Sequence, residues 1–491
     1  MVAGIAALAV WLAGVGGAYG WFTDELYFLA CARHPALGYV DHPPLATLGL
    51  AVLRFVAGPR MAVIRLAPAL ADAAAIVGTG RLARQLGGRA VAQTLAAALL
   101  ALAPAMIVIA GFYSMNPFDV LFAVLLTRVA LALAGGAAPR AWLPLGALAG
   151  CALLVKHQAL VPAGLLVLAV LASPARAQLR TRWPYLGLAL ALALVAPNLA
   201  WLVAHDWITL DFYRESVALK NIATSPAGAL LGQALLVGPV AFAVALLGAA
   251  ALLARPDHRG FGAVFVLAVV AMMIAGVSRA DRIIGLYPLV FAAGAVAVER
   301  GTRARRWLLG VGVAALALGA VPPLPLVLPV MPPDRLAAYA ARLGVTPQFD
   351  RAKQGTMPQW LADKLGWREL AEQVAAVYAT VPAPDRGRVV LFGDDYGAAG
   401  ALALYGPGLG LPSTVISPHD EFWAWGPGAI PDPIVIAVGH DATFWSALFR
   451  SVERAGTIRA PHAFHDGVAI WLVQGNAPGL AARWPQLRRF E

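Results

Sequence analysis

The chain has 491 residues, of which 60% are hydrophobic and only 13% are charged, and its mean hydropathy is +0.72. This composition excludes a soluble globular protein and predicts a polytopic membrane protein. The net charge of +11 does not indicate a nucleic-acid partner, because the arginines gather in short loops between apolar runs. Cys31 and Cys151 allow at most one disulfide, and Cys151 lies inside an apolar run, so we expect no pairing.

Apolar runs of about 15 to 25 residues, the length that a hydrocarbon core requires, recur along the first two thirds of the chain. They predict about eleven transmembrane helices, at residues 2–22, 61–80, 90–110, 117–134, 141–155, 158–172, 184–203, 228–254, 260–277, 283–298 and 307–328. No basic segment precedes the first run, so it reads as a span and not as a cleavable signal peptide.

The arginines of the membrane part fall in alternate loops, which marks those loops as cytoplasmic. On that orientation most acidic residues between spans face outward, so we expect the chemistry outside the cell. The span assignment has one alternative: residues 141–172 could form one long helix instead of two short ones. A merged helix would carry the arginines of 176–182 to the outside, and we therefore keep two spans.

Asp24 and Glu25 stand side by side where the first span ends. A carboxylate pair at the membrane boundary can face both an aqueous acceptor and a lipid-borne substrate, as a transferase with a lipid-linked donor requires. The outer loop that follows, about 23–60, predicts two helices lying along the membrane, at 24–33 and 45–56.

A proline-rich stretch, 321–333, ends the last span, and charged residues return after it. We expect a transmembrane domain over 1–330 and a small α/β domain outside the membrane over 331–491. Its predicted strands are 388–392, 414–417, 434–438 and 468–473, and its predicted helices are 367–378, 396–405 and 443–455.

Several motifs match a known pattern. The run Asp24-Glu25-Leu26-Tyr27-Phe28, followed by Gly38-Tyr39-Val40-Asp41-His42-Pro43-Pro44-Leu45, resembles the first outer loop of glycosyltransferase family 39 in the GT-C superfamily. That family holds the protein O-mannosyltransferases and the bacterial lipid A aminoarabinose transferases. The stretches 112–119, 156–157 and 197–201, and three motifs within 395–427, look like markers of a bacterial branch.

The resemblance implies transfer of a sugar from a polyprenyl-phosphate carrier to a protein, lipid or glycan acceptor, at the outer face of a bacterial inner membrane. It makes Asp24 the general base or the residue that positions the acceptor. Glu25 points about 100° away on a helix, so it is expected to orient Asp24 or hold a polar neighbour. Asp119 is a second candidate carboxylate, with a helix cap as its alternative role.

The leaving phosphate requires cations at the depth of a lipid head group. Lys156 and His157 lie at the outer turn between two spans, and Arg279 and Arg282 precede the tenth. The two arginines have an alternative, pairing with Asp281 or with anionic lipids. Two further candidates follow from the resemblance: Tyr287 in the donor cavity, and His42, which stands where relatives often carry lysine.

No tight ligand spacing predicts a metal site, and the sequence leaves open whether a divalent cation takes part. The histidine and acidic clusters at 419–421 and 462–466 read as surface loops. A transporter or flippase of lipid-linked sugars is the alternative function, but no repeated halves are evident. A third interpretation makes the C-terminal domain a binding module with the spans as its membrane anchor. Eleven spans are far more than an anchor needs, which argues against it.

Overall fold

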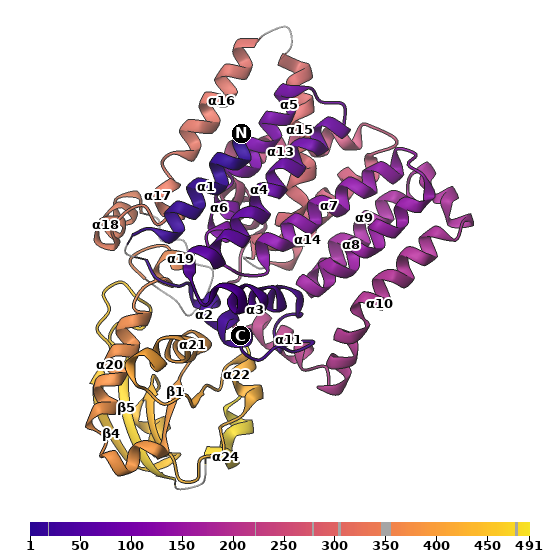
Figure 1. Ribbon diagram of the computed structural model, residues 1–491. Coiled ribbons are helices and arrows are strands. Elements are labelled where there is room, and N and C mark those ends of the chain that lie inside the picture. Colours follow the sequence, from indigo (N-terminus) through magenta and orange to yellow (C-terminus); the bar gives the residue numbers. More distant parts are fainter. Residues whose placement is uncertain (18, 221, 277–278, 303–305, 345–354, 477–479) are drawn as a thin grey trace.

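The computed structural model describes residues 1–491 except 18, 221, 277–278, 303–305, 345–354 and 477–479. Helices build most of it, and a small sheet unit lies at one end of the helical bundle (Figure 1). The bundle consists of α1 (Val2–Val15), α4 (Met61–Gln85), α5 (Ala90–Ala101), α6 (Pro104–Ala110), α7 (Asn116–Ala134), α8 (Trp142–Val155), η2 (His157–Ala159), α9 (Leu160–Leu171), η3 (Pro174–Arg180), α10 (Trp183–Ala204), α12 (Pro226–Val237), α13 (Pro239–Leu253), α14 (Arg259–Ala275), η4 (Ala280–Leu286), α15 (Tyr287–Thr302) and α16 (Arg306–Ala320).

Each of the eleven predicted spans overlaps one of these helices or a bent pair. The first helix ends at Val15 and not at the predicted residue 22, and the last ends at Ala320 and not at the predicted residue 328. Among the described residues, four spans are straight helices long and apolar enough to cross a membrane, and three bent pairs raise that number to seven. The others correspond to shorter apolar helices, α1, α8, α14 and α16. The chain is therefore a multi-pass membrane protein, as its composition predicts.

The bent pairs break where proline begins the second segment. The angles are 64° before Pro104, 95° before Pro174 and 107° before Pro239. Proline lacks the N–H that would continue the preceding helix, and it is tolerated in a first turn. The breaks before Pro104 and Pro239 each divide one predicted apolar run into two helices, whereas the break before Pro174 separates the run 158–172 from a short arginine-bearing segment.

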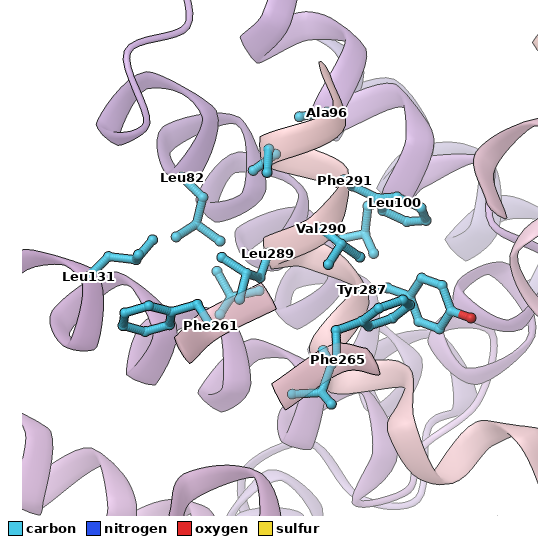
Figure 2. Packing of buried hydrophobic residues seen from close by; sticks show 14 of the residues in the cluster. Leu82, Ala96, Leu100, Leu131, Phe261, Phe265, Tyr287, Leu289, Val290 and Phe291 are labelled. Carbon is cyan, nitrogen blue, oxygen red and sulfur yellow. The ribbon is translucent and has the colours of Figure 1, made fainter. Parts of the chain in front are cut away.

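Small residues let the spans approach closely. A Cβ added at Gly146 of α8 would lie 1.9 Å from the carbonyl oxygen of Gly187 in α10, and one at Gly248 of α13 would lie 1.9 Å from that of Val290 in α15. Such contacts are typical of helix pairs in membranes. Figure 2 shows the larger side chains that fill the bundle around α15, including Phe265, whose ring lies 5.3 Å from that of Tyr287.

The C-terminal unit contains one five-stranded sheet in the order β2-β1-β3-β5-β4. Strands β1 (Val389–Gly393), β2 (Val415–Ile416) and β3 (Ile434–Val438) are parallel, whereas β5 (Ala469–Asn476) runs antiparallel to both β3 and β4 (Phe449–Thr457). The helices of this unit are α20 (Trp367–Thr380), α21 (Tyr396–Tyr405), α22 (Asp420–Trp425), α23 (Ala442–Ser446) and α24 (Leu480–Arg483). Three other helices, α17 (Leu324–Val327), α18 (Pro333–Leu343) and α19 (Gln359–Ala362), pack beside α1 and α6 of the bundle.

The α/β character predicted for this region is confirmed, but the helix predicted at 443–455 is wrong over most of its length. Only Ala442–Ser446 is helical, and β4 follows it as the outermost strand of the sheet. The side chains of β4 are mostly exposed or half-buried, so the strand lacks the apolar alternation that would reveal it in the sequence. Its pairing with β5 decides the structure.

Two helices of the segment 23–60, α2 (Thr23–Cys31) and α3 (Leu45–Ala57), lie between the bundle and the sheet unit (Figure 1). Helix α3 exposes apolar side chains, among them Phe55 at 91%, as a helix on a membrane surface does. Helix α2 is instead covered by α21: a Cβ added at Gly400 would lie 2.9 Å from Leu26. The two predicted domains thus share a hydrophobic core, while their division at residue 330 stays a prediction. A last helix, α11 (Ile208–Lys220), follows α10.

Candidate active site

Asp24 lies in the first turn of α2 and is half-buried. The hydroxyl of Tyr396, the first residue of α21, donates a hydrogen bond of 3.0 Å to its Oδ1 atom. Burial raises the pKa of Tyr396 well above its ordinary value, and the charge of Asp24 raises it further. Tyr396 therefore keeps its proton at neutral pH and acts as a hydrogen-bond donor to the carboxylate.

Glu25 points the other way, into packed protein. Its carboxylate is fully buried and accepts hydrogen bonds from the backbone N–H groups of Phe22 and Tyr113, both at 2.9 Å. The guanidinium of Arg65 on α4 pairs with it at 2.5 Å and also donates to the carbonyl oxygens of Gly14 and Gly20. This arrangement joins α2 to the end of α1, to α4 and to the segment before α7.

A cavity opens beside Asp24. It consists of two adjoining hollows of about 200 and 190 Å³ that share five lining residues, and we call it the Asp24 cavity. The shared residues are Asp24, Asn116, Arg279, Asp281 and Tyr396. One carboxylate of the sequence pair, that of Asp24, thus faces the cavity, while Glu25 is absent from its described lining.

Cations and their partners line this cavity. Lys156 donates to Oδ1 of Asn116 at 3.0 Å and lies 3.7 Å from Oδ2 of Asp119. Arg279 pairs with Asp281 through two contacts of 3.0 and 3.1 Å, which is the alternative that the sequence left open for it. Asp119 makes no capping hydrogen bond in α7, and its contact is with Lys156 instead.

An apolar groove of about 620 Å³ adjoins the second hollow. Its walls include residues of α9, α14 and η4, with Leu165, Leu267 and Leu286 among them. Lys156 and Arg282 line both the groove and the Asp24 cavity. A molecule with a long apolar chain and an anionic head could therefore place the chain among the helices and the anion at these two cations.

Three predicted phosphate ligands lie outside the described lining of the cavity and the groove. His42 is fully buried, with Nδ1 2.9 Å from Asp41 and Nε2 2.7 Å from Thr47. His157 is bonded through Nε2 to Asn198 at 2.9 Å. The hydroxyl of Tyr287 donates to Gln233 at 2.7 Å, within the core of Figure 2.

Asp41 lines the cavity in place of its neighbour His42. It accepts a hydrogen bond of 2.6 Å from Tyr27. Burial acts to raise the pKa of Asp41, but the adjacent His42 outweighs it, and the pKa is lowered. Asp41 is thus another carboxylate in the cavity, and His42 positions it.

Sequence reasoning missed Tyr396, Asn116 and Arg65 as parts of this site. Asn116 and Tyr396 stand inside motifs that carry the family resemblance, but nothing local assigns them a contact. Tyr396 is 372 residues from the carboxylate that it bonds. Arg65 offered one signal, a charge inside an otherwise apolar run, which usually has a buried partner.

Comparison with known proteins agrees with this architecture. The structure of ArnT from Cupriavidus metallidurans in the apo state matches with a TM-score of 0.61 and 16% identity over 96% of this chain and 97% of that one. The same protein bound to undecaprenyl phosphate matches with a TM-score of 0.57, the same identity and the same coverage. The chain therefore shares its fold with that protein over nearly its whole length.

The resemblance to family 39 is confirmed. Residues 41–201 match the family model described as dolichyl-phosphate-mannose-protein mannosyltransferase. A search of the curated proteins returns no match to this sequence. The chain is thus similar to this family over residues 41–201 and to ArnT in its fold.

Proposed function

We propose that the chain is a glycosyltransferase that moves a sugar from a polyprenyl-phosphate carrier to an acceptor at the outer face of a bacterial cytoplasmic membrane. The observation that carries this proposal is the junction of the apolar groove with the Asp24 cavity at Lys156 and Arg282. The family match and the undecaprenyl phosphate bound to the similar ArnT structure support it. No feature of the described residues favours the transporter alternative.

The groove holds the polyprenyl tail, and the phosphate lies against Lys156 and Arg282. Charge-assisted hydrogen bonds from these cations stabilise the phosphate as it leaves. Arg279 also lines the cavity, but it is paired with Asp281. The carboxylate of Asp281 offsets its positive charge, so Arg279 adds little net positive charge near the phosphate. The sugar then extends into the Asp24 cavity.

Asp24 accepts the proton of the acceptor hydroxyl or amine. The acceptor atom bonds to the anomeric carbon while the bond from that carbon to the carrier phosphate oxygen breaks, and the configuration inverts. The phosphate leaves with the bonding electron pair on the polyprenyl carrier. Tyr396 holds the Asp24 carboxylate in place through its hydrogen bond.

The C-terminal unit forms one wall of the site. It contributes Tyr396 and Asp420 to the lining of the Asp24 cavity. We place this unit, 331–491, outside the membrane, on the side of the first outer loop, and the catalytic transmembrane domain over 1–330. The acceptor then approaches from the aqueous side and the donor from the lipid.

The proposal is tested with the purified protein in lipid nanodiscs. A panel of polyprenyl-phosphate sugars, differing in sugar and chain length, is incubated with it and with bacterial membrane extract, and products are identified by mass spectrometry. We expect one class of donor to lose its sugar to an acceptor. Asp24→Asn should abolish that transfer and still bind the carrier lipid.

The matched control is Asp211→Asn, a carboxylate on α11 that is half-exposed and lines none of the cavities described above. It should transfer as the unaltered protein does. Unchanged transfer by Asp24→Asn would refute the role of Asp24 as base. Passage of intact lipid-linked sugar across the bilayer, with no transfer, would establish the transporter alternative instead.

A further inference from the structure

A cluster outside the proposed catalytic site gathers three ligand-type side chains. Asp394 and Asp395 directly follow β1, and His465 comes from the segment between β4 and β5. One ligand atom from each lies within 4.8 Å of the others. None of the three is part of the lining of the Asp24 cavity or of the apolar groove.

The distances within this cluster are too long for good hydrogen bonds. Nε2 of His465 lies 3.4 Å from Oδ1 of Asp394 and 3.4 Å from Oδ2 of Asp395, whereas a charge-assisted N–H···O bond is about 2.7 to 2.9 Å long. Two ligands of a tetrahedral zinc ion, each about 2.0 to 2.1 Å from the metal, lie about 3.4 Å apart. The observed separations fit a shared cation better than a direct contact.

Two of the ligand atoms, from His465 and Asp394, are also buried without a hydrogen bond. Neither Nε2 of His465 nor Oδ1 of Asp394 has a hydrogen-bond partner among the described residues, and the side chain of His465 is 3% exposed. A buried polar atom without a partner is costly, and a bound ion removes that cost. The cluster therefore has its ligand atoms in place.

Surrounding groups hold the cluster in this geometry. Oδ1 of Asp395 accepts a 2.7 Å hydrogen bond from the N–H of Ala398, which leaves Oδ2 directed at His465. The ring of His465 packs 4.9 Å from that of Trp367. At position 439 only glycine leaves room, because a Cβ there would lie 2.2 Å from Oδ2 of Asp394. Such support is typical of metal ligands.

We propose that Asp394, Asp395 and His465 bind one divalent cation of the zinc type. One imidazole and two carboxylates form a donor set that zinc accepts, with a water molecule in the fourth position. The ion joins the corner between β1 and α21 to the segment before β5. Since α21 begins with Tyr396, the ion also steadies the helix that carries the hydroxyl bonded to Asp24.

The test uses the full-length protein in detergent. After treatment with a chelator and dialysis, Zn²⁺ is added, and binding is measured by calorimetry and by metal analysis of the washed protein. We expect about one Zn²⁺ per chain, and a higher thermal unfolding temperature with Zn²⁺ than without it. Replacement of Zn²⁺ by Co²⁺ should give the visible absorption of a tetrahedral cobalt site.

Variants locate the ion. His465→Ala and the isosteric Asp394→Asn should lose at least tenfold in Zn²⁺ affinity, and the rise in unfolding temperature should disappear. The matched control is His462→Asn, three residues from His465, whose ring contacts Asp334 and Thr356 instead. It should bind Zn²⁺ as the unaltered protein does.

Two results would overturn the proposal. If the unaltered protein binds no Zn²⁺, the cluster is an ion-paired imidazolium between two carboxylates. If Asp24→Asn loses the ion while Asp394→Asn keeps it, the metal belongs to the Asp24 cavity. Asp394 is the most exposed of the three side chains, at 21%, so its asparagine variant keeps the test valid even where His465→Ala does not fold.

Discussion

The two faces of helix α2 carry the two carboxylates of one sequence pair. The surroundings of these carboxylates differ in burial and in bonding partners. Asp24 faces a cavity lined by cations and is half-buried. Glu25, the next residue, is fully buried and is held by Arg65 and by two backbone N–H groups. The first environment leaves a carboxylate accessible to a substrate, and the second uses one to fix three segments of the chain.

This difference shows that two identical charges at one membrane boundary need not share a role. When the neighbours of a carboxylate are all fixed protein groups, removing any partner leaves a buried charge unpaired, which strongly destabilises the fold. A carboxylate beside a cavity has room for a reacting group. Changes on the two faces should therefore separate stability from activity.

The largest expected effect is on the buried face. Arg65→Ala leaves Glu25 buried without its cation and should lower the free energy of unfolding by about 3 to 5 kcal/mol. Thermal unfolding in detergent, followed by tryptophan fluorescence, measures it. Asp24→Asn is the control and should unfold within a few degrees of the unaltered protein. Equal losses in both variants would contradict the division between the two faces.

The second prediction concerns Lys156, which lines the cavity and which we expect to bind the phosphate of the donor. Lys156→Met removes a charge-assisted contact worth about 1.5 to 3 kcal/mol, so the KM for a polyprenyl-phosphate donor should rise by about one to two powers of ten. The change also leaves Asp119 without its cation. The double variant Lys156→Met, Asp119→Asn removes that penalty, and its KM should stay raised if Lys156 contacts the phosphate.

Tyr396 connects the cavity face to the C-terminal unit. Tyr396→Phe removes one hydrogen bond to Asp24 and should lower kcat by about five- to tenfold, as expected for a loss of about 1 kcal/mol. The pH dependence of kcat should also move, whereas a merely structural role would leave its shape unchanged. Tyr405→Phe, at the far end of the same helix, is the control.

The smallest expected effect concerns the contact between the C-terminal unit and the segment 23–60. Glu421 accepts a 2.8 Å hydrogen bond from the N–H of Val40, and burial raises the pKa of Glu421 to about 8 from its ordinary value of 4.5. A raised folded-state pKa means that the native protein holds this proton more tightly than the unfolded chain. Its contribution to stability is complete below about pH 4.5 and is lost as the pH rises through about 8.

Unfolding temperatures measured across this pH range should fall by a few degrees more in the unaltered protein than in Glu421→Gln, which cannot titrate. The solvated carboxylate at position 453 of β4 supplies the control, Glu453→Gln, which should keep the slope of the unaltered protein. Parallel curves for the unaltered protein and Glu421→Gln would show that this carboxyl group does not titrate on unfolding.

Much of the architecture follows from local chemistry. Apolar runs of membrane length predict every span of the bundle, and prolines such as Pro104 and Pro239 mark where two of those runs bend. The strands at 389–393 and 434–438 are apolar throughout and are recognisable for that reason. Strand β4 is not, because its polar residues gain their structure only from pairing with β5.

The candidate site divides in the same way. The sequence by itself determined the membrane class and the family resemblance, and it singled out Asp24 as a candidate carboxylate, since each depends on composition or on neighbouring residues. Tertiary structure alone decided that Glu25 meets Arg65, that Tyr396 meets Asp24 and that His465 meets Asp394 and Asp395. Those contacts join residues 40 to 372 positions apart in the first two cases, and no local pattern encodes a contact that only the folded chain brings within bonding distance.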